Sequence, residues 1–217
     1  MNSSVAIVRC TDYTTERVWD AVRRAVDLVG GRRAFARPGE RVLVKPNILA
    51  GDPPERATAT HPSVVAAVVR LLSESGAQVF YGDSPGTGRP VVAARKSGIT
   101  AAAEGAGARF ADVGCQADLS LAGGARIRTV PVIESARTCH AIVSVPKLKT
   151  HGLMRITGAV KNQLGCVYGL HKARMHVLAQ EVNEFGELLV DINQALAPRL
   201  YVMDAVVAME GNGPRSG

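Results

Sequence analysis

The sequence predicts an α/β protein with a mostly parallel sheet, helices on both faces and Rossmann-like layering. Short apolar runs alternate along the 217 residues with longer segments whose apolar residues recur at helical spacing. That alternation is typical of parallel strands joined by crossover helices. In addition, four of the predicted strands are each followed directly by polar residues. The length suits a single α/β domain over residues 1–217.

Three strands are predicted in the first half of the chain, over residues 5–8, 41–44 and 78–81. A helix over residues 16–29 separates the first two, because its apolar residues lie at helical spacing. Thr14 or Thr15 is the predicted N-terminal cap of this helix, and a pair of glycines ends it.

Two further helical segments follow in this half of the chain. One begins at Pro62, since proline suits the first helical turn, and closes at Ser75-Gly76. His61 precedes it and is interpreted as its cap rather than as a metal ligand. The other covers residues 91–107 and is interrupted at Gly98.

The second half of the chain repeats the alternation. Strands are predicted over residues 110–113, 127–132, 141–145 and 200–203. Pro146 is expected to end the third of these, because proline has no N–H for the ladder. A helix over residues 184–196 is stopped by Pro198.

The composition favours small anionic partners over nucleic acid. The formal net charge is +7, but the arginines are scattered along the chain. Aromatic residues make up only 4%, so there is little on which nucleic-acid bases could stack. No nucleic-acid-binding motif is present. We therefore expect an anionic small molecule as partner, and no nucleic acid.

The cysteines and the apolar runs exclude other classes. Cys10, Cys115, Cys139 and Cys166 form no C-x-x-C pair, so no self-contained iron–sulfur cluster is expected. The N-terminus has no basic region followed by a long apolar core. No apolar run reaches the roughly 18–20 residues that span a bilayer. These features predict a cytoplasmic protein with no membrane partner.

Polar residues follow four predicted strands and are expected to meet in one crevice. The carboxyl ends of parallel strands lie along one edge of a sheet, where α/β proteins bind ligands. The residues are Lys45 and Asn47; Asp83 and Ser84; Lys147, Lys149 and His151; and Asp204, with Glu210 and Asn212 beyond it.

The residues in this crevice suit an oxyanion such as a phosphate or carboxylate. Ammonium groups, hydroxyls and free N–H groups at a helix start bind such groups. Predicted binding residues, besides those of the strand ends, are Thr150, Thr157, Gly158, Lys161 and Asn162. Predicted catalytic residues are Lys147, Lys149, His151 and Asp83. Lysine charges should lower the pKa of His151 and keep it neutral.

A divalent metal is a second expectation for the crevice. Asp83, Asp204 and Glu210 are the candidate ligands, because carboxylates suit hard cations. Each residue also has a plainer interpretation, since aspartates are common in turns and a lysine can extend from a strand end to solvent. No glycine-rich phosphate loop of the standard types is present.

The motifs resemble a known family, domain of unknown function 362. The matching segments occur in order over nearly the whole chain, and they are Val44–Asn47, Thr60–Pro62, Gly82–Gly86, Pro146–His151, Thr157–Asn162, Asp191–Asn193, Asp204–Ala205 and Glu210–Pro214. The family has no established general activity. Many members carry a ferredoxin-like module for two four-iron clusters, which this chain lacks.

The resemblance carries two further implications. Similar proteins continue beyond the segment that ends at Gly217, so we expect the domain to be incomplete at its C-terminus. A looser similarity exists to the nickel-dependent lactate racemase fold, whose site uses lysines and histidines between α/β lobes. That similarity is an analogy of fold.

Two functions stay open on the sequence. The first is an enzyme that binds an anionic small molecule or metal-bound cofactor at the strand ends, for redox or acid/base chemistry. The second is a non-catalytic scaffold or electron-transfer subunit that docks a ferredoxin-like partner, which the basic surface would suit. A homo-oligomer is compatible with either.

Overall fold

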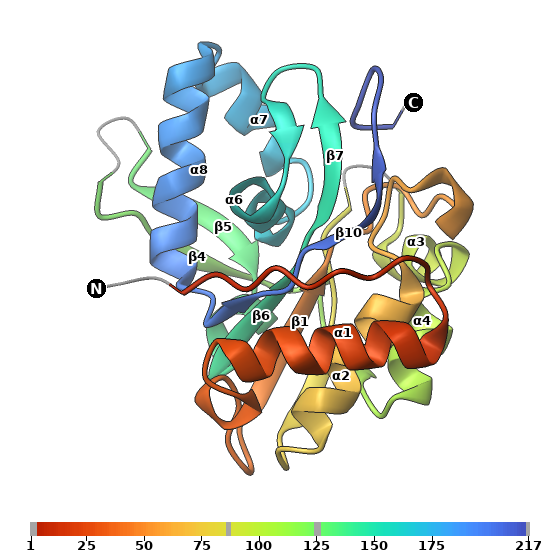
Figure 1. Cartoon of the computed structure of the whole chain (residues 1–217). Coiled ribbons are helices and arrows are strands. Elements are labelled where there is room, and N and C mark those ends of the chain that lie inside the picture. Colours follow the sequence, from red (N-terminus) through yellow and green to blue (C-terminus); the bar gives the residue numbers. More distant parts are fainter. Residues whose placement is uncertain (1–3, 86–87, 124–126, 216–217) are drawn as a thin grey trace.

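The computed structural model describes residues 4–85, 88–123 and 127–215. Its main sheet has five strands in the order β3-β2-β1-β6-β9, and all four neighbouring pairs are parallel. The strands are β1 (Arg41–Pro46), β2 (Gln78–Tyr81), β3 (Arg109–Phe110), β6 (Ala141–Val145) and β9 (Leu200–Tyr201). The predicted α/β class is therefore confirmed (Figure 1).

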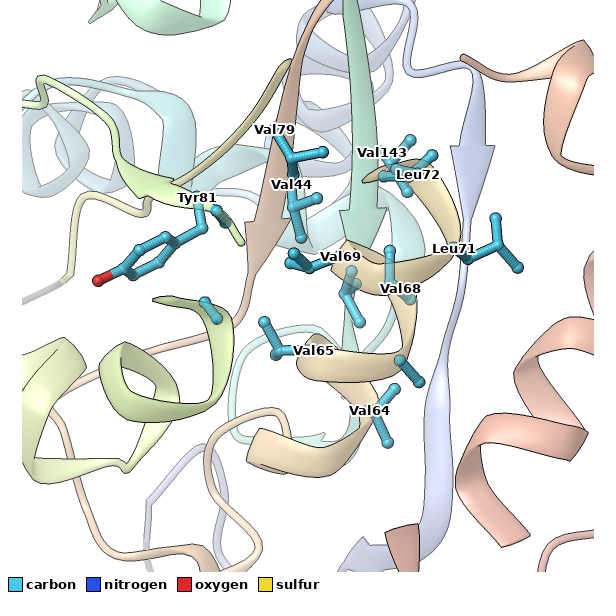
Figure 2. Close-up of a cluster of buried hydrophobic side chains, with 14 of the residues drawn as sticks. Val44, Val64, Val65, Val68, Val69, Leu71, Leu72, Val79, Tyr81 and Val143 are labelled. Carbon is cyan, nitrogen blue, oxygen red and sulfur yellow. The ribbon is translucent and has the colours of Figure 1, made fainter. Parts of the chain in front are cut away.

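One face of this sheet is covered by four helices. They are α1 (Thr15–Leu28), α2 (Pro62–Ser73), α3 (Pro90–Lys96) and α4 (Ile99–Gly105). Successive strand residues point to opposite faces, so Val42 and Val44 join this core while Leu43 joins the other. Figure 2 shows side chains of α2, among them Val65 and Val69, lying against this face of the sheet.

The opposite face is covered by helices and a hairpin. The helices are α5 (Ser135–Thr138), α6 (Ala159–Asn162), α7 (His171–Leu178) and α8 (Val182–Leu196), with the short 3-10 segment η3 (Gln163–Cys166). The antiparallel strands β4 (Gln116–Ser120) and β5 (Thr129–Ile133) complete the layer. Phe185 and Ile192 of α8 are fully buried, in the same hydrophobic cluster as Leu43 and Ile142 of the sheet. Helices thus lie on both faces, as predicted.

A small second sheet continues the chain beyond β6. Its strands are β7 (Lys147–His151), β8 (Arg155–Thr157) and β10 (Asp204–Met209), in the order β10-β7-β8. The prediction that Pro146 ends the strand is correct for β6. The backbone stays extended, however, and pairs again in β7, because a proline removes only its own ladder bond. The Pro146 carbonyl accepts a hydrogen bond from Asp204 N at 2.9 Å.

Several local predictions need correction. Residues 5–8 form no strand, and Val5 and Ile7 are exposed, since no strand pairs with this segment. β3 (Arg109–Phe110) shares only Phe110 with the strand expected over residues 110–113, and β4 was not predicted at all. Thr14 occupies the cap position of α1 but its side chain makes no cap hydrogen bond. His61 does cap α2, because its ring accepts a hydrogen bond from Ser63 N.

Two remaining observations complete the fold. Gly86, part of the predicted turn after β2, lies outside the described residues. Within residues 4–85, 88–123 and 127–215, none of the helices has the length and apolar character needed to cross a membrane.

Candidate functional site

The strand order creates a switch point between β1 and β6. From β1 the chain adds β2 and β3 on one side, whereas β6 and β9 lie on the other. Lys45 of β1 is in register with Ser144 of β6, so the two carboxyl ends are neighbours. Ligand sites in open α/β sheets lie at such points, because crossover connections leave in opposite directions there.

Lys45 and Asp83 meet at this point in a buried ion pair. Lys45 Nζ lies 2.7 Å from Asp83 Oδ1, with both side chains buried. The same ammonium donates to the Pro46 carbonyl and to Asn162 Oδ1, each at 2.9 Å. Gly165 packs so closely that any side chain there would overlap both ions. Lys45 thus has one ion-pair partner and two hydrogen-bond acceptors.

Lys147 forms a second buried ion pair, with Asp204. Lys147 Nζ lies 2.9 Å from Asp204 Oδ2 and 2.8 Å from the hydroxyl of Tyr13. That hydroxyl donates to Asp204 Oδ1 at 2.8 Å, and His61 N donates to Oδ2 at 2.9 Å. The Tyr13 ring stacks on His61 with centroids 3.6 Å apart. This node ties β7, β10, α2 and the N-terminal segment together.

Lys149 has a different environment, although it lies only two residues further along β7. It donates to the Thr58 carbonyl at 2.6 Å and to Asn47 Oδ1 at 3.2 Å. No carboxylate of the described residues forms an ion pair with it. Burial, together with the positive charge of Lys161, lowers the pKa of Lys149 to about 7. Lys149 therefore exchanges a proton near neutral pH.

Lys161 is the least engaged of the lysines at this point. It lies on α6, half-buried, and within the described chain no hydrogen bond or ion pair involves its ammonium group. Burial and the neighbouring Lys45 charge lower the pKa of Lys161 to about 8. Its N–H groups are thus available to a ligand.

Two hydroxyls of the small sheet are buried without partners. Thr157 of β8 is directly opposite Lys149 of β7 and is 3% exposed. Neither its hydroxyl nor that of Thr150 finds a hydrogen-bond partner in the described structure. Buried polar atoms are usually satisfied, so the Thr157 hydroxyl, on the same face as Lys149, marks a place where a ligand group would fit. Thr150 lies on the opposite face of the sheet, beside Gly213.

Asn162 and Gly158 help to position helix α6. Asn162 Nδ2 donates to the Lys45 carbonyl at 3.1 Å and to Ser144 Oγ at 2.9 Å. With Oδ1 bonded to Lys45, the side chain joins α6 to β1 and β6. Gly158 is the N-cap residue of α6 and packs near Met203.

His151 lies at the end of β7 and is half-buried. Its Nδ1 accepts a hydrogen bond from Met154 N at 3.2 Å, which leaves the proton on Nε2. The pKa of His151 is lowered to about 4, first by burial and then by the Lys161 charge. The ring is neutral at pH 7, and burial contributes more than the lysine charges that the sequence suggested.

The three predicted metal ligands are not brought together. Asp83 is paired with Lys45 and Asp204 with Lys147, while Glu210 and Asn212 are exposed. The described residues contain no cluster of three or more His, Cys, Asp or Glu side chains suited to a metal ion. Two carboxylates already neutralised by buried ammonium groups do not fit a divalent cation.

Three participants were missed by the sequence reasoning. Tyr13 comes from the extended N-terminal segment and Thr58 from the loop after β1, and neither carries a local signal. Lys172 of α7 donates to Ser84 Oγ at 2.7 Å and also contacts the Ser84 and Pro85 carbonyls. The basic residues over 171–174, which include Lys172, were the one available hint in the sequence.

Fold and site together define a class: an α/β protein whose buried lysines gather at the switch point of a parallel sheet. The chain belongs to the family described as "Domain of unknown function (DUF362)", which it matches over residues 42–217. It is 36% identical to the thylakoid-associated protein sll1697 of Synechocystis sp. over 226 residues. That match covers 100% of this chain and 67% of the relative.

Solved structures show the same fold. The lactate racemase apoprotein of Thermoanaerobacterium thermosaccharolyticum matches with a TM-score of 0.54 at 13% identity, over 86% of this chain and 48% of that one. A protein of Thermotoga maritima matches with a TM-score of 0.53 at 12% identity, over 91% and 52%. The chain therefore spans about half the length of these solved structures, and the likeness concerns the fold alone.

Proposed function

We propose that the lysine cluster binds a small organic anion and transfers a proton at it. The observation that carries this proposal is the contrast among the buried lysines. Lys45 and Lys147 are neutralised by aspartates, whereas Lys149 and Lys161 have no carboxylate partner among the described residues. Buried charges without a counter-ion are costly, and an anionic ligand would supply one.

Each side chain would have a distinct task. Lys161 is the candidate for a direct ion pair with the anion, because its N–H groups have no partner in the described chain. The Thr157 hydroxyl, buried and unbonded, would donate to a second oxygen of the same group. The ion pairs of Lys45 and Lys147 would hold the strands that carry the site in position.

Lys149 is the candidate for proton transfer. General acid–base catalysis is most effective when the pKa lies near the working pH, and that of Lys149 is lowered to about 7. His151 is less suitable as a base, since its pKa is lowered to about 4. The resulting proposal is an acid/base enzyme.

The fold relationship suggests the first anion to test. One solved structure with this fold is named lactate racemase apoprotein, so a small carboxylate is a reasonable ligand class. We expect calorimetry to detect binding of L-lactate or D-lactate, and Lys161→Met to weaken that binding about tenfold or more, as expected for a lost charge-assisted hydrogen bond.

Lys96→Met is the matched control, because Lys96 is an exposed lysine at the end of α3. Thermal unfolding establishes that both variants fold. Equal weakening by the two substitutions would mean that only overall charge matters, and would refute the proposal. Failure of the unaltered protein to bind either lactate enantiomer would refute this ligand class.

A further inference from the structure

A groove of about 580 Å³ lies beside the lysine cluster, at the carboxyl ends of β2 and β3. Its described walls come from Ser84 and Pro85 after β2, the start of α3, the segment after β3 and the segment before α7. The volume falls in the usual range of small-molecule sites, roughly 300–1,000 Å³. We call it the Ser84 groove, after the buried serine that lines it.

The groove is mainly apolar, with few polar groups. Val91, Phe110 and Tyr168 contribute apolar and aromatic surface. Arg89, which is exposed, and Asp112 supply opposite charges among the lining residues. A cavity of this kind suits the hydrophobic body of a small molecule, with a polar group fixing its orientation.

Ser84 is the polar group best placed to fix that orientation. Its Oγ accepts hydrogen bonds from Lys172 Nζ at 2.7 Å and from Gly169 N at 3.3 Å. Both lone pairs are then in use, so the hydroxyl can act only as a donor. Among the described residues no hydrogen bond takes up the hydroxyl proton, although Ser84 is 6% exposed.

Lys172 gives this donor its preference for an anion. Its ammonium group has no carboxylate ion pair within the described chain; its bonded partners are the Ser84 hydroxyl and the carbonyls of Ser84 and Pro85. When a cation donates a hydrogen bond to a hydroxyl oxygen, it polarises the O–H bond. The hydroxyl then becomes a stronger hydrogen-bond donor to a third group. The positive charge also attracts an anion to the groove.

We propose that the Ser84 groove binds an organic anion with an aromatic or apolar body, whose anionic oxygen accepts a hydrogen bond from Ser84. The aromatic body packs against Val91, Phe110 and Tyr168, and the charge of Lys172 lies behind the serine. This site is distinct from the Lys149–Lys161 cluster and does not depend on the function proposed for that cluster.

The experiment uses 2-naphthoate as the probe and 2-naphthamide as its uncharged counterpart. Calorimetric titration of the unaltered protein is expected to show naphthoate binding about tenfold or more tightly than naphthamide. Val91→Trp should abolish naphthoate binding by filling the groove. Val92→Trp is the matched control, since Val92 is equally exposed on α3 but does not line the groove.

Ser84→Ala tests the anion recognition directly. It should weaken naphthoate about tenfold and leave naphthamide unchanged, whereas Lys161→Met should leave naphthoate binding in the groove intact. Unchanged binding in Val91→Trp, or loss in Lys161→Met, would place the probe elsewhere and overturn the proposal. Equal affinity for the two probes, or no naphthoate binding at all, would overturn it as well.

Discussion

Lys147 and Lys149 are two residues apart on one strand, yet their neighbours give them opposite roles. Lys147 Nζ has Asp204 at 2.9 Å, and that carboxylate also binds Tyr13 and His61. Lys149 has only a carbonyl and an amide oxygen as acceptors. The first lysine is therefore part of the framework, and the second retains a charge that a ligand can neutralise.

Asp204→Asn should destabilise the protein strongly, because it leaves the Lys147 ammonium buried without a counter-ion. We expect the free energy of unfolding to fall by about 3–5 kcal/mol. Urea denaturation at pH 7 measures this. Asp118→Asn is the control, since Asp118 is exposed on β4 and forms no ion pair among the described residues. A loss below about 1 kcal/mol would show that the ion pair is not essential.

The three-stranded sheet is held from outside by the segment after β10. Gly213 accepts a hydrogen bond from Gly152 N at 3.1 Å and lies so close to the Thr150 carbonyl that no side chain fits. Two residues further on, Arg215 forms a two-pronged ion pair with the buried Asp52. The loop after β1 and the end of the described chain are thus joined beside β7.

Gly213→Ala should detach this segment, because the added methyl group would overlap the Thr150 carbonyl. We expect a loss of about 1–3 kcal/mol in unfolding free energy and faster hydrogen exchange at the Gly152 amide. Gly105→Ala is the matched control, as a methyl group there meets no other atom. Protection of Gly152 equal to that of the control would contradict this contact.

Across the protein, the buried lysines link stability to pH. Burial lowers the pKa of Lys149 to about 7 and those of Lys161 and Lys172 to about 8, from 10.5. Between these values the unfolded chain binds more protons than the folded one. Stability therefore increases as the pH rises from about 7 towards 9. Above that range the raised pKa of Cys166 opposes the trend.

Urea unfolding between pH 7 and pH 9 should show this increase directly. Lys149→Met removes the largest contributor, so the variant should be more stable than the unaltered protein at pH 7, by roughly 1–3 kcal/mol, with a shallower slope. Lys96→Met should keep the original slope. Identical slopes in the two variants would mean that Lys149 keeps an ordinary pKa in the folded state.

The spacing of apolar residues and the positions of glycine and proline were sufficient to predict most of the main sheet. The strands over residues 78–81 and 141–145 and the interruption at Gly98 are found as predicted, because each depends on neighbours in the chain. The placement of polar residues after buried strands also predicted one region for Lys45, Asp83 and Lys149, and Lys45 and Asp83 form a buried ion pair. Hydrophobic pattern and strand direction are local properties, and a single sequence reveals them.

The tertiary structure decided which partner each buried lysine has. Whether a lysine meets an aspartate or stays unpaired depends on how segments 38 residues apart or more are placed, as in Lys45 with Asp83 and Lys147 with Asp204. Tyr13 joins the second pair from an extended segment that has no periodicity of its own. The sequence determines which side chains are charged. Whether a charge is neutralised depends on a contact between distant segments, and only packing brings those segments together.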